Sequence, residues 1–343
     1  MRKVGMLMDE IQLRNLELKI EYRKRILPEF ARDFLTSLEL DKSPRTQLEY
    51  AKDIQLFFEY LIEEEVVDKN HIRELTLKDL KKVTDNDIQN FMNYLTKYKK
   101  EFLSVGGNKT IQEFTNGPKG KERKRVSVHG LYNYLIEKNL INKNPTENIR
   151  IKVEKFTRKP LLSDQELNRM LDVALFENPH RYRAVRNFNI IKILAFTGIQ
   201  ISELVNLNID DIWQERNEMV VVRKDGEEES IYLDKKIRYD LYSYLNMRKE
   251  IKNVKKGHKN ALFLSQRMRR MDPKSVRKMI RKVAGEAGVN IHVTPQTFRR
   301  TFGWKHYNEH GDIELTTGVL GNRTTETTRY NYAIVGSKHT RSY

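Results

Sequence analysis

The chain has 343 residues, of which 38% are hydrophobic, so it is long and apolar enough to form two folded domains. Lys and Arg number 64 against 47 Asp and Glu, and the formal net charge of +17 predicts a polyanionic partner. Nucleic acid is the first candidate and an anionic membrane surface the second. The lack of cysteine excludes disulfides and thiolate metal sites. We see no signal peptide and no apolar run of about 20 residues, which predicts a soluble cytoplasmic protein that does not enter a membrane.

The first part of the chain has the pattern of helices. One apolar repeat at helical spacing consists of Leu27, Phe30, Phe34, Leu35 and Leu38. Ser43 followed by Pro44 predicts an N-cap and the start of a second helix, and Asp85 can cap a third. Turn signals lie at 106–107 and 116–118, and a basic run at 119–125 leads into a further helix. We therefore expect a helical domain over residues 1–148.

A basic segment without clear periodicity, residues 149–160, is interpreted as a linker, and residues 161–343 as a second domain. Ser163 and Glu166 have the spacing of a capped helix start, and 190–196 has the apolar density of a buried helix. Residues 219–223 and 230–233 resemble strands, with a turn at Asp225 and Gly226 between them. From Pro273 onward the pattern is helical again.

Four motifs in the second domain form an ordered frame. They read Thr197-Gly198-Ile199-Gln200-Ile201-Ser202-Glu203-Leu204, Thr294-Pro295-Gln296-Thr297-Phe298-Arg299-Arg300-Thr301-Phe302-Gly303, Leu320-Gly321-Asn322 and Thr327-Thr328-Arg329-Tyr330-Asn331-Tyr332. In order and spacing this frame resembles the catalytic domain of the tyrosine recombinases, the phage integrase family. The resemblance implies a mainly α fold, in which a helical core-binding (SAM-like) domain precedes a catalytic-type domain that is α with a small antiparallel β-sheet. Within the family, the chain is most similar to the single-recombinase Xer type of Gram-positive bacteria and their phages.

The resemblance also implies a chemistry and assigns residues to it. Members attack a DNA phosphodiester with a tyrosine oxygen, without a metal or cofactor, while two arginines bind the phosphate. Tyr332 matches the nucleophile, with Tyr330 as the competing position. Arg299 matches the second arginine, and Lys224 matches a hairpin lysine that protonates the leaving oxygen.

Three matching positions are substituted. Gln200 replaces the first arginine, Gln296 replaces a histidine, and Asn322 replaces a histidine or tryptophan. Each amide keeps a hydrogen-bonding group but removes a cation or a titratable group, and losing one such donor typically costs on the order of 100- to 1,000-fold in rate. We therefore predict a sequence-specific binder of double-stranded DNA with lost or impaired catalysis, such as a phage or mobile-element repressor in a bacterial nucleoid. The alternative is an active recombinase that forms a 3'-phosphotyrosyl intermediate at Tyr332.

DNA contacts are predicted at basic and hydroxyl side chains of both domains and the linker. They are Arg45, Thr46, Lys52, Lys121, Arg123, Lys124, Arg125, Lys152, Lys155, Arg158, Lys159, Arg223 and Arg300. The short tail after Tyr332 leaves self-association on DNA open, and an RNA-bound scaffold is a third alternative. His306, Glu309 and His310 fit a zinc-protease pattern, but the recombinase frame already accounts for this segment, so we expect no metal site.

Overall fold

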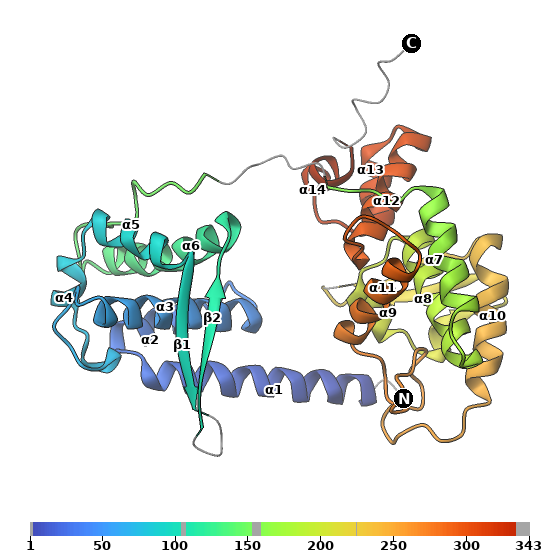
Figure 1. Ribbon diagram of the computed structural model, residues 1–343, viewed down its shortest axis with the longest axis horizontal. Helices are drawn as coiled ribbons and strands as arrows, with labels where there is room; N and C mark the ends of the chain where they lie inside the picture. The colour runs from blue at the N-terminus through green and yellow to red at the C-terminus, as the bar shows by residue number, and fades with distance from the viewer. Residues whose placement is uncertain (1–2, 104–107, 153–158, 224, 334–343) are drawn as a thin grey trace, which may run out of the picture. The chain divides into compact units, whose positions relative to one another are not determined.

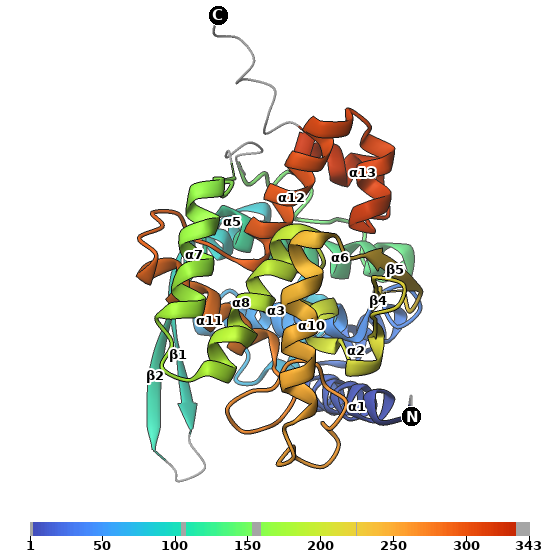
Figure 2. The same cartoon turned by 90° about the vertical axis from the view of Figure 1, so that its right-hand side faces the viewer.

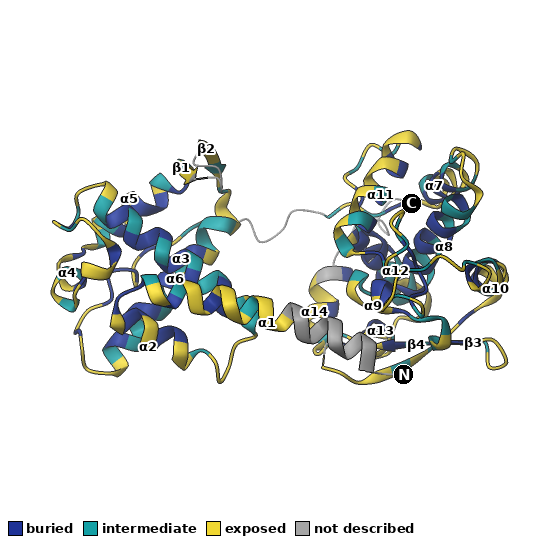
Figure 3. Cartoon of the chain, turned by 90° about the horizontal axis from the view of Figure 1, so that it is seen from below, coloured by how far each residue is buried: buried dark blue, intermediate teal, exposed yellow. Residues whose placement is uncertain are grey.

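Two units make up the chain, residues Met1–Phe156 and Thr157–Tyr343. The computed structural model describes residues 3–103, 108–152, 159–223 and 225–333 (Figure 1). Each unit has its own buried core (Figure 3). No helix in these ranges is both long and apolar enough to cross a membrane.

The first unit consists of helices and one exposed hairpin. Its elements are α1 (Lys3–Ile26), α2 (Glu29–Ser37), α3 (Pro44–Glu63), the short helix η1 (Ile72–Glu74), α4 (Leu77–Lys82), α5 (Asp85–Tyr94), β1 (Lys97–Leu103), β2 (Lys109–Thr115) and α6 (Pro118–Glu137). The predicted cap of α3 is confirmed, because the Ser43 hydroxyl accepts a hydrogen bond from the Thr46 amide. The predicted cap of α5 is one residue off: Thr84 is the cap and Asp85 is the first helical residue.

The hairpin β1–β2 was not predicted from the sequence. Its strands pair antiparallel from Lys97 opposite Thr115 to Leu103 opposite Lys109. An aromatic ladder runs along its base, where the Tyr98 ring stacks on Tyr94 at 5.2 Å and on Phe114 at 5.3 Å between centroids. The predicted turn at 106–107 lies outside the described residues.

The second unit is built around helix α8, which contacts α7, α10 and α12 (Figure 2). Its elements are α7 (Asp164–Phe176), α8 (Arg181–Thr197), α9 (Ile201–Asn206), η2 (Ile209–Asp211), β3 (Ile212–Trp213), β4 (Glu218–Val222), β5 (Glu228–Tyr232), α10 (Lys235–Lys249), α11 (Pro273–Glu286), α12 (Pro295–His310), α13 (Ile313–Leu320), α14 (Thr325–Thr328) and the π-helical segment η3 (Arg329–Ala333). Ile190, Ile193 and Leu194 of α8 are fully buried. Because α8 is held in the core and ends at Thr197, its packing fixes the position of the first motif of the frame.

A three-stranded antiparallel sheet of order β3-β4-β5 lies in the second unit. The two longer strands pair with Met219 opposite Ile231. The predicted turn between them is confirmed at Gly226, which has φ +93° and donates its amide to the Arg223 carbonyl. The predicted fold class, mainly helical with a small antiparallel sheet, is therefore confirmed.

Candidate active site

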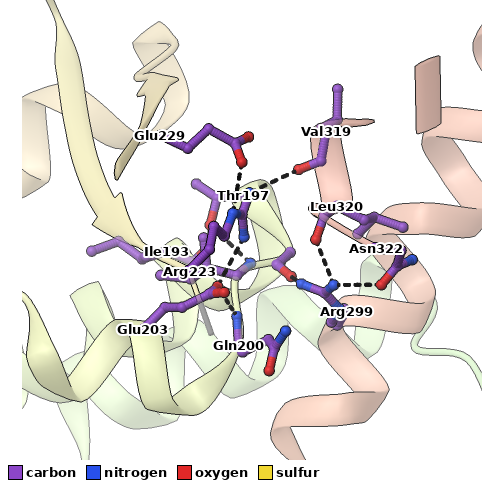
Figure 4. Close-up of polar contacts among 12 residues, drawn as sticks. Ile193, Thr197, Gln200, Glu203, Arg223, Glu229, Arg299, Val319, Leu320 and Asn322 are labelled. Atoms are coloured by element: carbon purple, nitrogen blue, oxygen red, sulfur yellow. Dashed lines mark hydrogen bonds and ion pairs between the residues drawn. The ribbon is translucent and has the colours of Figure 1, made fainter. Parts of the chain in front are cut away.

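Arg299 is the centre of the site. It lies in α12, which begins at Pro295 after the capping residue Thr294, and its side chain is almost wholly buried. One guanidinium nitrogen donates to the Gly198 carbonyl at 2.8 Å. The other donates to the Leu320 carbonyl at 2.5 Å and to the Asn322 Oδ1 at 2.9 Å (Figure 4). Arg299 therefore ties together three of the four motifs of the frame.

Two left-handed glycines deliver these carbonyls. Gly198 ends α8 with φ +64° and Gly321 ends α13 with φ +60°, a conformation that residues with a Cβ rarely adopt. A Cβ at Gly198 would lie 2.4 Å from the Phe302 ring. The Thr-Gly and Leu-Gly pairs of the sequence are thus helix ends that bring two chain segments against α12.

Asn322 uses both ends of its amide. Its Oδ1 accepts from Arg299, and its Nδ2 donates to the Thr328 hydroxyl at 3.0 Å. The residue therefore connects the guanidinium to α14. Asn322 was predicted to weaken catalysis because it replaces a ring. In the structure its side chain holds the Arg299 guanidinium in position.

Tyr332 lies in η3 and is almost wholly buried, with a relative exposure of 2%. Its ring packs on Gly303 of α12, where a Cβ would lie 3.0 Å from the ring. Its hydroxyl accepts a long hydrogen bond, 3.5 Å, from Gln296 Nε2. Tyr330 is instead 46% exposed, and the Lys159 ammonium lies over its ring at 5.5 Å from the centroid. Tyr332 therefore packs on α12 and contacts Gln296, a residue of the frame.

A pocket of about 170 Å³ opens beside these residues. Its lining consists of Ile199, Gln200, Ile201, Arg277, Thr294, Pro295, Gln296 and Arg299. Two arginines and no carboxylate are present among these described residues, which suits an anion. Arg277 was not predicted from the sequence, because α11 has five basic residues and nothing local shows which one reaches the pocket.

Gln200 connects this pocket to a buried ion pair. Gln200 immediately precedes α9, and its backbone N–H donates a hydrogen bond to Glu203 Oε2 at 2.7 Å. The same oxygen accepts from Arg223 at 3.0 Å, and Arg223 also contacts Glu229 at 2.7 Å. Burial acts to lower the pKa of Arg223, but Glu229 and Glu203 outweigh it, and the pKa lies above its ordinary value. Arg223 was predicted to contact DNA, but its side chain is buried and held by Glu203 and Glu229. Its neighbour Lys224 lies outside the described residues.

Arg300, also predicted to contact DNA, is likewise buried. It donates to the Pro160 carbonyl and to the Thr297 hydroxyl, each at 3.4 Å. Burial lowers its pKa, and the nearby Tyr332 opposes that effect. Arg300 therefore stabilises the start of α12 from inside the unit, and its side chain does not lie on the surface as a DNA contact would.

The basic run of the first unit lies inside α6, not in a loop, and helix periodicity turns its residues to different sides. Arg123 forms a two-pronged contact with the buried Asp53 at 2.6 and 2.9 Å. Lys124 is buried, with its ammonium 3.7 Å from the same carboxylate. Burial raises the pKa of Asp53 against the lowering effect of the two cations. Lys124 therefore serves the core of this unit and does not face solvent.

The other predicted DNA contacts are more accessible or lie elsewhere. Two of them, Arg45 and Lys152, are exposed. Four others have polar contacts within the first unit: Lys121 with the Thr96 hydroxyl, Arg125 with Glu122, Lys52 with Glu49, and Thr46 with the Ser43 hydroxyl. Lys155 and Arg158 lie outside the described residues. In the part of the chain that the structure describes, no cluster of three metal-binding side chains is present. His306 instead bonds to the Thr316 hydroxyl at 2.9 Å and lies edge-on to His310.

Comparisons with known proteins show the family and the fold of the chain. The model of the phage integrase family matches residues 161–339, more than half of the chain, so the chain belongs to this family of tyrosine recombinases. The chain is 26% identical to tyrosine recombinase XerS of Streptococcus thermophilus, over 93% of this chain and 96% of the relative. It is 27% identical to tyrosine recombinase XerC of Caldanaerobacter subterraneus, over 89% of this chain and 81% of the relative.

Two solved structures share the fold. One is XerH recombinase bound to a palindromic difH substrate in a post-cleavage complex, with a TM-score of 0.63, 21% identity and coverage of 93% of this chain and 92% of that one. The other is a lambda integrase dimer bound to a COC' core site, with a TM-score of 0.62, 14% identity and coverage of 92% and 96%. At these identities the likeness establishes the fold.

Proposed function

We propose that the chain is a site-specific recombinase that cuts and rejoins double-stranded DNA through Tyr332. The observation that supports this best is the fixed Arg299 guanidinium at a pocket with no carboxylate among its described lining residues, where Gln296 donates a hydrogen bond to the Tyr332 hydroxyl. The names of the relatives and the DNA in the XerH and lambda integrase complexes point to the same partner and reaction.

In the proposed reaction, the Tyr332 oxygen bonds to phosphorus as the bond from phosphorus to the 5' oxygen breaks. The tyrosine loses its proton, and the leaving oxygen gains one, for which Lys224 is the matching donor in the family. Arg299 meets the negative charge on the phosphate oxygens. Because Tyr332 is almost wholly buried, η3 must shift before the hydroxyl reaches DNA.

A second candidate is a DNA-binding regulator that no longer cuts. The neutral amides of Gln200, Gln296 and Asn322 favour it, because each stands where the family usually has an arginine or the ring of a histidine or tryptophan. Affinity for DNA comes from many phosphate contacts, so binding can persist after the catalytic residues are lost. The two candidates differ in one observable, a covalent bond to DNA.

The test begins with selection of a bound duplex from a random pool. The protein is then incubated with that duplex nicked near its centre, and the products are separated under denaturing conditions. We expect a covalent adduct that Tyr332→Phe abolishes and that the matched control Tyr330→Phe retains. A wild-type protein that binds the duplex but forms no adduct would favour the regulator, and loss only in Tyr330→Phe would overturn the assignment of the nucleophile.

A further inference from the structure

We infer that Arg277 of α11 is a catalytic residue that supplies the cation missing at Gln200 and binds the reacting phosphate together with Arg299. The inference rests on the proposed function and deepens it. It concerns a residue outside the four motifs of the frame, brought to them by the packing of α11 against α9.

The first argument is the composition of the pocket. Arg277 and Arg299 are its two cations, and among the described lining residues no acid neutralises them. Gln200, Gln296 and Thr294 add neutral hydrogen-bonding groups. At roughly 30 Å³ per water, the volume of about 170 Å³ has room for a phosphodiester group.

The second argument is that the two arginines differ in burial and in how many of their donors are already used. Arg299 is buried, and both of its terminal nitrogens already donate to protein oxygens. Arg277 is exposed, so its long side chain can turn its planar fork toward a phosphate. Without Arg277, the pocket would offer one cation whose donors are largely occupied.

The third argument is helix register. Val276, Ile280 and Val283 of α11 point into the core, which places Arg277 at the edge of the buried face. Arg281 lies one turn further along the same side, is also exposed, and does not line the pocket. It is therefore a matched control for the removal of one positive charge from α11.

The experiment measures the rate of adduct formation on the nicked duplex at saturating protein. We expect Arg277→Ala to slow the reaction by on the order of 100- to 1,000-fold, as for the loss of one preorganised donor, and Arg277→Lys to slow it less. Arg281→Ala should slow it by less than about 10-fold under the same conditions, since it removes charge but not the pocket cation. Gln200→Arg in the Arg277→Ala background should restore much of the rate. Equal rates in Arg277→Ala and Arg281→Ala would overturn the inference.

A binding measurement separates this inference from the proposed function. Single neutral methylphosphonates are placed at successive phosphates of the duplex, and the affinity of each variant is measured. Wild type and Arg281→Ala should lose affinity at one central phosphate, and Arg277→Ala should lose clearly less affinity there, because only Arg299 still contacts that phosphate. If the wild type forms no adduct but this pattern appears, the recombinase proposal fails and the phosphate contact stands. If Arg277→Ala responds like the wild type at every phosphate, the contact does not exist.

Discussion

Replacing Arg223 with methionine should destabilise the second unit strongly. The side chains of Arg223 and Glu203 are 7% and 4% exposed, so the substitution leaves a carboxylate inside the protein without its cation. Breaking a buried ion pair in this way typically costs about 3–5 kcal/mol. The contact with Glu229 adds little, because that carboxylate is 36% exposed and screened by solvent.

Urea denaturation followed by tryptophan fluorescence measures this loss in the intact chain. Both tryptophans, Trp213 and Trp304, lie in the second unit, so the signal follows that unit alone. With a slope of about 2 kcal/mol per molar urea, the expected loss lowers the midpoint by about 1.5–2.5 M.

The control is a double variant, Arg223→Met with Glu203→Gln. It removes the stranded charge, while the new amide oxygen can still accept from the Gln200 backbone. The Glu203 Oε1 is already buried without a hydrogen-bond partner among the described residues, so charge there is costly. We expect the double variant to be more stable than the single one. A single variant that loses less than about 1 kcal/mol, or a double variant weaker than the single, would refute the reasoning.

Three further outcomes are expected. Gly303→Ala should destabilise the second unit by about 1–3 kcal/mol in the same assay, because its Cβ would lie 3.0 Å from Tyr332; a gain in stability would contradict this packing. Burial, and then His310, hold the pKa of His306 below its ordinary value of 6.5, so its contribution to stability is present above that pH and lost as pH falls through the lower folded pKa. As the pH falls below 6.5, the urea midpoint should therefore drop less steeply in His306→Gln than in the wild type. Identical pH profiles of the two proteins would contradict this role of His306. Arg45→Ala should weaken DNA binding and reduce the slope of log affinity against log salt by about 1, whereas Lys124→Met, a buried position, should leave the slope unchanged; the reverse result would mean that Lys124 faces the DNA.

Local signals in the sequence were sufficient for several elements. The caps at Ser43 and Ser163 and the turn at Gly226 depend on neighbours within a few residues, and each was predicted correctly. The hairpin β1–β2 was missed because its second strand is exposed along nearly its whole length, so it has no alternation of apolar and polar residues.

The site was harder to predict because it depends on packing over long separations. Charge alone suggested that Arg223 and Lys124 face DNA, whereas the fold places both inside. Arg277 reaches the pocket only because α11, which begins at Pro273, packs on α9, which ends far earlier in the chain at Asn206. A family frame predicts which positions belong together, but it cannot show which other side chains the fold adds to them.

The aromatic ladder at the base of the hairpin has a consequence for how that hairpin opens. Tyr98 is clamped between Tyr94 and Phe114 near the paired ends Lys97 and Thr115, whereas the far ends, at Leu103 and Lys109, have fewer ring contacts. Opening should therefore start at the far end and stop at the stacked rings. In hydrogen exchange this predicts a gradient among the amides that form cross-strand hydrogen bonds, with protection higher toward the Lys97–Thr115 end than toward the Leu103–Lys109 end.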